Sequence, residues 1–337
     1  MKKIKSISMA CVCAAVAFAI SLPTAVPAGA ADWSYKVLDT PASFTGDFGL
    51  RLWSGHAKTG KNLYDTTGTQ LLSRLTYDNL TIFTGEGYGR FDFNTGWFLK
   101  GYAGGGALWD GKLKDEDFPP GISPYSATLS TNKNSSQSYG SVDGGFKLLW
   151  GADFHVGLYA GYHFLRETVN AYGCGEIATN PLVCAGGIPD FVKVISQVNN
   201  WHSLRVGLDA AVEINRFKLS LDAAFVPYVH LSGADAHWLR IDPTARFVGA
   251  FTGPVPEDGN GWGYQLDGFL SYRVNEVLTV GAGARYWQMQ TRGLTHFEGH
   301  VVGINALPQV VQWKTSNFGA FLQTSIKLGP YPLISTN

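Results

Sequence analysis

Long hydrophobic runs are nearly absent from this sequence of 337 residues. After residue 31, no stretch approaches the roughly 18 uninterrupted apolar residues of a membrane-spanning helix, so any role in a membrane would have to use strands. The one long apolar run, MACVCAAVAFAISL, follows three lysines and precedes the small residues of AVPAGAADW. This order predicts a cleaved signal peptide over residues 1–31 and an exported protein.

An excess of charge of either sign is also missing. The chain has 26 Lys and Arg residues against 26 Asp and Glu residues, and the predicted signal peptide takes away three lysines but no acid. The mature chain is therefore mildly acidic, which argues against a nucleic-acid partner.

Cysteine is scarce, and two of the four cysteines, Cys11 and Cys13, belong to the predicted signal peptide. Cys174 and Cys184 remain, in the short polar segment YGCGEIATNPLVCAGG. In an exported protein, such a pair predicts a disulfide. The alternative is two free thiols.

What the sequence does contain is strict alternation of apolar with polar or small residues, as in LRVGLDAAVEI at 204–214. A soluble sandwich also alternates, but its buried face would hardly collect so many charges. A closed barrel in a membrane, with a polar lumen, accounts for both faces. The residues expected to face lipid are Leu204, Val206, Leu208, Leu278 and Val280. The charged residues expected on the lumen side are Arg205, Asp209, Glu213, Asp267, Arg273 and Arg285.

Turns and loops alternate along the chain. Tight turns are predicted at 93–96, 150–153, 214–217 and 274–277, and long polar segments near 58–62, 111–138, 171–195, 235–260 and 296–308. This alternation predicts an all-β protein, a ten-stranded antiparallel transmembrane β-barrel over 32–329 with five extracellular loops. A C-terminal tail is expected over 330–337. The strand that begins near Thr69 exceeds the ~9 to 11 residues needed to cross the hydrocarbon, so the barrel should project beyond the outer membrane. Aromatic residues crowd the tight-turn ends, as in a membrane-interface girdle: Phe91, Phe93, Trp97, Trp150, Phe154, Phe217 and Tyr272.

Two pairs of polar residues stand out in the outer segments. Asp115 and Asp117, and Asp235 and His237, each have the i, i+2 spacing that puts both members on one face of a strand. A carboxylate beside an imidazole suits general-base chemistry; the alternatives are solvated surface charges and a surface histidine. Counted from lipid-facing Phe217, Asp235 has outward parity, so a bulge at Pro227 or Gly233 is needed to turn it inward.

The chain resembles the omptins, a family of ten-stranded outer-membrane aspartyl-type endopeptidases, over nearly its whole mature length. The similar segments are SGHAKTGKNLY (54–64), LLSRLTYDNL (71–80), GKLKDEDF (111–118), GLYAGYHFLR (157–166) and ADAHW (234–238). The resemblance implies a catalytic site made of Asp115, Asp117, Asp235 and His237. In it, His237 takes a proton from a water held opposite the Asp115/Asp117 pair, and Asp235 orients the imidazole.

The resemblance also implies where and on what the protein acts. It would be a monomer in the outer membrane of a Gram-negative bacterium, with its site open to peptide and protein substrates outside the cell. It would need no cofactor, and the absence of a His/Glu/Cys ligand cluster around His237 fits a mechanism without metal.

Two departures from the family concern specificity and lipid. The family's preference for basic residues rests on acids in the first loop and two positions before the dyad aspartate. Here those places read HAKTGKN and Gly233, so a different cleavage specificity is expected. Lipopolysaccharide, which the family needs as an activator, would contact Tyr162 and Arg166 on the outer wall. The resemblance implies an acid between these two residues and a basic residue on the next strand, where this sequence has Phe164 and Asn200. Arg166 could equally be an arginine that snorkels to the interface.

Two rival functions use the same fold. One is a non-enzymatic outer-membrane barrel, an adhesin or structural scaffold. The other is a diffusion porin, which fits less well because a ten-stranded barrel has a lumen largely filled by its own side chains. The discriminating feature is geometric: in an enzyme the two pairs should face each other with room for one water.

Overall fold

The computed structural model describes residues 44–118, 125–178, 183–184 and 186–329. The predicted signal peptide (1–31) and C-terminal tail (330–337) lie outside these residues. The described part is almost entirely strand, with one short 3-10 helix. The elements are β1 (Phe44–Tyr64), β2 (Leu71–Phe93), β3 (Trp97–Trp109), β4 (Lys112–Asp117), β5 (Ser126–Asn132), β6 (Ser135–Trp150), β7 (Phe154–Glu176), β8 (Ile188–Ile214), β9 (Phe217–His237), η1 (Trp238–Arg240), β10 (Val255–Arg273), β11 (Leu278–Thr295) and β12 (Gln309–Leu328).

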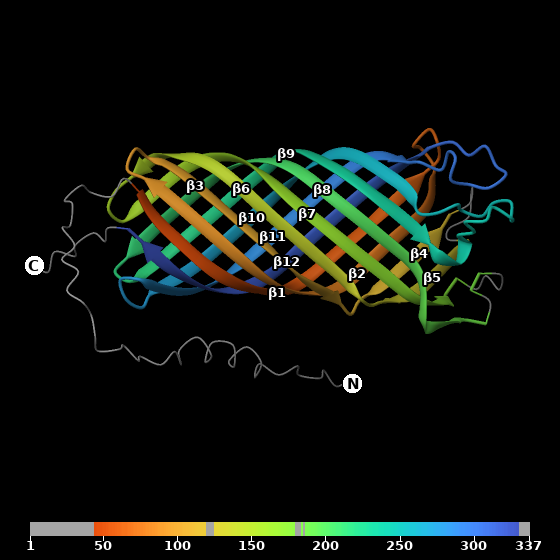
Figure 1. Cartoon of the computed structure of the whole chain (residues 1–337), viewed down its shortest axis with the longest axis horizontal. Coiled ribbons are helices and arrows are strands. Elements are labelled where there is room, and N and C mark those ends of the chain that lie inside the picture. The colour runs from red at the N-terminus through yellow and green to blue at the C-terminus, as the bar shows by residue number, and fades with distance from the viewer. Residues whose placement is uncertain (1–43, 119–124, 179–182, 185, 330–337) are drawn as a thin grey trace, which may run out of the picture. The chain divides into compact units, whose positions relative to one another are not determined.

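All strands belong to one antiparallel sheet of twelve strands. From β6 through β12, strands that follow one another in the chain pair with each other, and β1 pairs with both β2 and β12. The first and last strands of the chain are therefore neighbours, as in a β-barrel. Figure 1 shows these tilted strands wound side by side around a common axis, with β4 and β5 at one end.

The sheet has twelve strands where the sequence predicted ten, because two of the predicted strands are interrupted. β3 and β4 lie end to end along β2, and β5 and β6 both pair with β7. Asp110 and Gly111, between β3 and β4, have φ of 55° and 77°, and Asn134, between β5 and β6, has φ of 53°. These left-handed conformations break the strand at both places.

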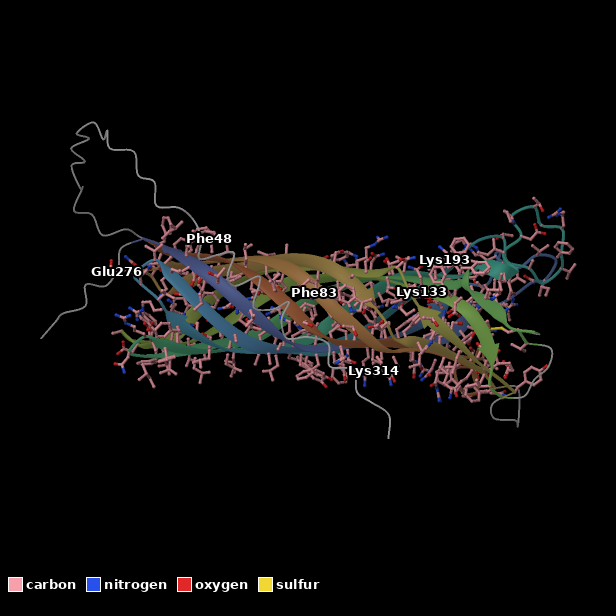
Figure 2. The ribbon with its side chains drawn as sticks, turned by 90° about the horizontal axis from the view of Figure 1, so that it is seen from below. Phe48, Phe83, Lys133, Lys193, Glu276 and Lys314 are labelled. Atoms are coloured by element: carbon pink, nitrogen blue, oxygen red, sulfur yellow. A yellow bond between two sulfur atoms is a disulfide. The ribbon has the colours of Figure 1, made fainter. Side chains whose placement is uncertain are left out.

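The two faces of the wall differ in polarity as the alternation predicted. Leu204, Val206 and Leu208 are 46–54% exposed on the outside, whereas Arg205 and Asp209 are at most 7% exposed inside. Val280 is also exposed, Arg285 is fully buried, and Leu278 is half-buried. Figure 2 shows Phe83 along the wall between Glu276, beside a short turn, and Lys193 toward the other end.

The interior is filled by paired charges and aromatic rings. Arg285 binds Glu86 at 2.5 Å and Asp267 at 2.6 Å, and Arg205 binds Asp222 at 3.0 Å. Around them pack the fully buried rings of Trp53, Trp201, Trp287 and Trp313. These charges have partners of opposite sign, so the cost of burying them is offset.

The four tight turns lie where the sequence predicted them, between β2 and β3, β6 and β7, β8 and β9, and β10 and β11. The predicted girdle residues beside them are mostly exposed, Trp97 at 59% and Phe217 at 51%. The first predicted loop is wrong: 58–62 belongs to β1, which runs to Tyr64, and the turn follows at 65–70. Within the part of the chain that the structure describes, no helix is long and apolar enough to cross a membrane.

A bulge in β9 changes which side chains of the C-terminal half of this strand face inward. Its pairings with β8 and with β10 both slip by one residue between Phe225 and Val229, on either side of Pro227. Before the slip, Phe225 is 53% exposed on the outer wall; after it, Asp235 is only 7% exposed. Proline has no backbone N–H to donate to a ladder, so it fits at such a position. Of the two bulge sites that the sequence offered, the structure uses Pro227 and not Gly233.

Candidate active site

Asp235 and His237 lie at the outer end of β9, well beyond the exposed aromatic Tyr228 of the wall. A hydrogen bond of 3.1 Å joins His237 Nε2 to Asp235 Oδ2. An ionised carboxylate only accepts, so Nε2 carries the donated proton. The other ring nitrogen, Nδ1, is then free to act as a base when the imidazole is neutral.

Lys61 is an unexpected third member of this site. It comes from β1, is 4% exposed, and its ammonium donates to Asp235 Oδ2 at 2.7 Å and to Glu257 Oε1 at 2.6 Å. The same oxygen of Asp235 therefore binds both Lys61 and His237. The ammonium also lies 5.3 Å from the ring centre of Trp313.

Glu257, at the start of β10, fixes the far side of Lys61. Its carboxylate also accepts hydrogen bonds from Gln197 Nε2 at 3.0 Å, Thr295 Oγ1 at 2.9 Å and Trp313 Nε1 at 3.1 Å. Four donors from four strands hold this carboxylate, so both it and the Lys61 ammonium have a defined position.

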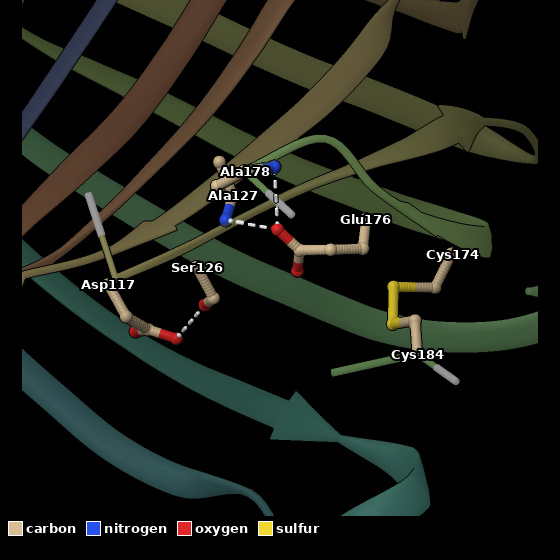
Figure 3. The surroundings of a disulfide bond; sticks show 7 residues. All are labelled: Asp117, Ser126, Ala127, Cys174, Glu176, Ala178 and Cys184. Atoms are coloured by element: carbon tan, nitrogen blue, oxygen red, sulfur yellow. Dashed lines mark hydrogen bonds between the residues drawn. A yellow bond between two sulfur atoms is a disulfide. The ribbon is translucent and has the colours of Figure 1, made fainter. Parts of the chain in front are cut away.

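Asp115 and Asp117 come from β4, on the face that also carries the buried Leu113. Asp115 is half-buried and lies opposite Leu75 of β2 in the register. Asp117 is exposed and its Oδ2 accepts a 2.9 Å hydrogen bond from the Ser126 hydroxyl of β5. Figure 3 shows this contact beside the disulfide.

Electrostatic interactions link the β4 pair to the β9 pair. Burial raises the pKa of Asp115 to about 6. The charge of His237 lowers this pKa, whereas the charges of Asp117 and Asp235 raise it further. Burial lowers the pKa of His237, but the charge of Asp235, its hydrogen bond and the charge of Asp115 outweigh this and raise it above the ordinary value. The charge of Asp115 and the charges of the β9 pair therefore influence one another.

The charges around Asp235 keep it ionised. Burial alone would raise the pKa of its carboxyl, but the charges of His237 and Lys61 and their hydrogen bonds hold it well below the usual range. The pKa of Lys61 is raised in turn, because Asp235 and Glu257 outweigh the effect of burial.

Three buried polar atoms in this site are left without a protein partner. Among the residues that the structure describes, the Tyr77 hydroxyl, Asp115 Oδ1 and Asp235 Oδ1 have no hydrogen-bond partner. Tyr77 is fully buried, and burial together with the charges of Asp235 and Asp115 raises its pKa well above the usual value. Buried polar atoms are normally hydrogen-bonded, so unpaired atoms here are suited to a water or a substrate group.

An aromatic residue covers the imidazole from the outer loop. The ring of Phe251 is 6% exposed and its centre lies 6.1 Å from that of His237. The guanidinium of Arg240, in η1, lies over the ring of this phenylalanine, 4.5 Å from the ring centre. Apolar cover of this kind strengthens the electrostatic interactions beneath it.

The predicted lipid-contact residues lie on the outer wall. Tyr162 is 39% exposed, and its hydroxyl is 2.6 Å from His202 Nδ1. Arg166 donates to Asn200 Oδ1 at 3.2 Å, so an amide stands where the resemblance implies a basic residue. Both side chains are on the exposed side of β7.

Cys174 and Cys184 form a disulfide, with their Cα atoms 5.9 Å apart. Beside it, Glu176 accepts backbone hydrogen bonds from Ala127 of β5 at 3.1 Å and from Ala178 at 2.7 Å (Figure 3). The bond thus closes the outer loop next to the strand that holds Ser126 and, through it, Asp117.

The structure therefore brings the four residues singled out in the sequence to one end of the sheet, and adds Lys61, Glu257 and Tyr77. Sequence reasoning missed Lys61 because its segment was taken for a loop. The alternation through Trp53, Ala57 and Thr59, all buried, would have indicated that Lys61 points inward. In the described ranges, no group of three or more His, Cys, Asp or Glu side chains could hold a metal ion.

Comparison with solved structures supports the fold. The crystal structure of outer membrane protease OmpT from Escherichia coli matches with a TM-score of 0.62 at 17% identity, over 85% of this chain and 97% of that one. The outer membrane protein OprG from Pseudomonas aeruginosa and Ail, the attachment invasion locus protein of Yersinia pestis, match at 12% and 10% identity with TM-scores of 0.35 and 0.25. The match with OprG covers 97% of that chain and 85% of this one, and the match with Ail covers 98% of that chain and 82% of this one.

No protein-family model matches the chain, and no curated protein matches it by sequence. The fold is that of an outer-membrane β-barrel.

Proposed function

We propose that the protein is an omptin-like endopeptidase of the bacterial outer membrane that hydrolyses peptide bonds with a water activated by His237. The observation that carries the proposal is the hydrogen bond between Asp235 and His237, together with the effect of the Asp115 charge on the imidazole. His237 is bonded to Asp235 at 3.1 Å and interacts electrostatically with Asp115 of β4. The fold shared with OmpT, an outer membrane protease, is compatible with this activity.

In this mechanism the water lies between the imidazole and the β4 carboxylates. His237 Nδ1 takes a proton from the water, whose oxygen attacks the peptide carbonyl carbon. The Nε2–H group stays bonded to Asp235, which stabilises the imidazolium that forms. The proton then passes from the imidazolium to the leaving amine as the C–N bond breaks. Asp115 holds the water through its unpaired oxygen.

Tyr77 gives this site a hydrogen-bond donor that the sequence did not suggest. Tyr77 is fully buried, and burial together with the charges of Asp235 and Asp115 raises the pKa of its hydroxyl and keeps it protonated. A donor that is fixed in a dry site stabilises developing negative charge on the carbonyl oxygen. We assign Tyr77 this role.

Specificity should differ from a preference for basic residues. The segment HAKTGKN, where the family has an acid, contributes the ammonium of Lys61 to the interior. Gly233, two positions before Asp235, carries no carboxylate. A Cβ at residue 233 would meet Asn199 Oδ1 at 2.6 Å, so there is little room for a longer side chain. A substrate arginine would therefore lack the carboxylate partners that such a side chain prefers.

The activity is tested with purified protein, supplemented with lipopolysaccharide, on a mixed peptide library. His237→Ala should reduce hydrolysis by about 10² to 10⁴-fold, the contribution of a positioned base. The matched control is His230→Ala, because His230 lies on the same strand but faces outward and bonds Asn260 at 3.0 Å. Equal hydrolysis by the wild type and His237→Ala would contradict the mechanism and favour the adhesin or scaffold function.

The setting of this activity is also part of the proposal. The apolar outer wall would cross the outer membrane as a barrel of ten strands, two of which are interrupted, with the site on the extracellular side and peptides or proteins as partners. Lipopolysaccharide would contact Tyr162 and Arg166, whose guanidinium suits a phosphate. Arg166→Ala should reduce the stimulation of hydrolysis by added lipopolysaccharide, whereas Arg246→Ala, in the outer loop, should not. Equal stimulation in both variants would contradict the contact.

A further inference from the structure

We propose that Lys61 is a positioning residue, which binds the same oxygen of Asp235 as His237 does and so limits how strongly that carboxylate favours the protonated imidazole over the neutral base. This inference deepens the proposed endopeptidase and rests on it for its role in catalysis. The contact itself is independent of the reaction. Lys61 Nζ and His237 Nε2 lie 2.7 and 3.1 Å from Asp235 Oδ2.

Sharing one oxygen makes the two donors competitors. A carboxylate that faced only the imidazole would bind its protonated form strongly and raise its proton affinity. The Lys61 ammonium neutralises part of that charge and occupies the better hydrogen bond. His237 is consequently held in place by Asp235 without being trapped as an imidazolium.

The ammonium can do this because it cannot leave. Glu257 binds it at 2.6 Å, and Gln197, Thr295 and Trp313 fix that carboxylate in turn. Lys61 is also 4% exposed, so solvent screens its charge little. A surface lysine with a mobile chain would have a much smaller effect.

Other charged groups also act on the same imidazole, and their effects must be distinguished from the effect of Lys61. From β4, Asp115 favours the protonated imidazole, whereas Lys61 opposes it. Tyr77 of β2 interacts with Asp235 and Asp115 and stays neutral. Glu257 of β10 faces Lys61, and Arg240 of η1 lies beyond Phe251. Removal of Lys61 alone should therefore raise the proton affinity of His237.

The test is a titration of His237 by NMR in the full chain, folded in detergent micelles with isotope-labelled histidine. The signal is assigned by its loss in His237→Ala. In Lys61→Met, the midpoint of the His237 titration should rise by about one pH unit, as expected for the loss of a nearby charge. Lys61→Arg keeps the charge and should restore the wild-type midpoint.

Two further variants guard against trivial results. Lys61→Met leaves Asp235 and Glu257 facing each other, so Lys61→Met combined with Glu257→Gln removes the repulsion, and its midpoint should rise as well. Lys58→Met is the control, because Lys58 lies on the outer face of the same strand and binds Asp78 at 3.0 Å. Its midpoint should equal that of the wild type.

The outcomes separate this inference from the proposed function. An unchanged midpoint in folded Lys61 variants would overturn the inference and leave Lys61 as a counterion of two buried acids. If peptides are hydrolysed, the acid limb of the pH–rate profile should move upward with the midpoint. If no peptide is hydrolysed even by the wild type, the proposed function fails, while the NMR shift still decides what Lys61 does to His237.

Discussion

Ser126 donates a 2.9 Å hydrogen bond to Asp117, whereas the Oδ1 atom of neighbouring Asp115 has no such partner among the described residues. The two carboxylates of β4 are thus unequal. Asp117 is exposed and tied to β5, and Asp115 is half-buried and interacts with His237. This inequality gives each of them a different expected contribution to hydrolysis.

Asp115→Asn should reduce kcat/KM by at least about 10²-fold, because it removes the carboxylate that holds the water near the base. Asp117→Asn should cost about tenfold, because an exposed carboxylate acts through a screened charge. Steady-state kinetics of both variants on one peptide would measure the difference. An equal loss in the two variants would mean that they act as a symmetric pair.

Hydrolysis should decline as the pH falls through the neutral range. The active form of His237 is neutral. Burial lowers its pKa, but the charge of Asp235 outweighs burial and raises the pKa above the ordinary value. Protonation therefore removes the base at a higher pH than in a free histidine. Asp115, with a pKa of about 6, then also takes up a proton as the pH falls further. In Asp115→Asn the acid limb should move to lower pH, since an anion that favours imidazolium is lost. A pH–rate profile with an acid limb below that of free histidine would contradict this assignment.

Tyr77→Phe should reduce kcat by about 10²-fold, the effect of losing one donor to the carbonyl oxygen. KM should change little, because the hydroxyl acts mainly on the charge of the transition state. Packing is preserved, since the ring remains in place. A variant with unchanged kcat would show that the buried hydroxyl has no part in the reaction.

Replacement of both Cys174 and Cys184 by serine should cost at most about 3 kcal/mol in the free energy of unfolding, because the loop that the disulfide closes is short. The barrel should still fold, which heat-modified migration in gel electrophoresis would report. The rate of hydrolysis should fall more in this variant than in a variant with a substitution in a distant loop. The disulfide lies beside Glu176, which binds β5, and Ser126 of β5 binds Asp117. Alkylation of two thiols in the untreated wild type would contradict the disulfide.

Much of the fold could be predicted because lipid and lumen impose opposite polarities on alternate residues. The wall positions of Leu204 and Arg205, and the need for a bulge near Pro227, follow from that period of two. The division of a strand at Asn134 could not be predicted, because a non-glycine residue adopts the left-handed conformation there. The segment around Gly60 suggested a loop, yet Gly60 belongs to β1 and pairs with both β12 and β2.

The site was predictable only where its residues form a local motif. Asp115 with Asp117, and Asp235 with His237, are each visible as an i, i+2 pair. Lys61, Glu257 and Tyr77 belong to three other strands, and no local pattern states which side chains meet across the interior. Their contacts depend on the strand registers, which a single chain reveals only in part.

The extra residue at Pro227 divides β9 into two halves with opposite parity. Before it, outward residues such as Phe225 are apolar and inward Asp222 pairs with Arg205; after it, the inward residues include Asp235 and His237 of the proposed site. Deleting one residue between Phe225 and Val229 would turn Asp235 and His237 to the outer wall without altering the composition of either half. For engineering, new side chains can therefore be grafted onto the outer half of β9 while its lipid-facing half is left as it is, provided that this insertion is kept.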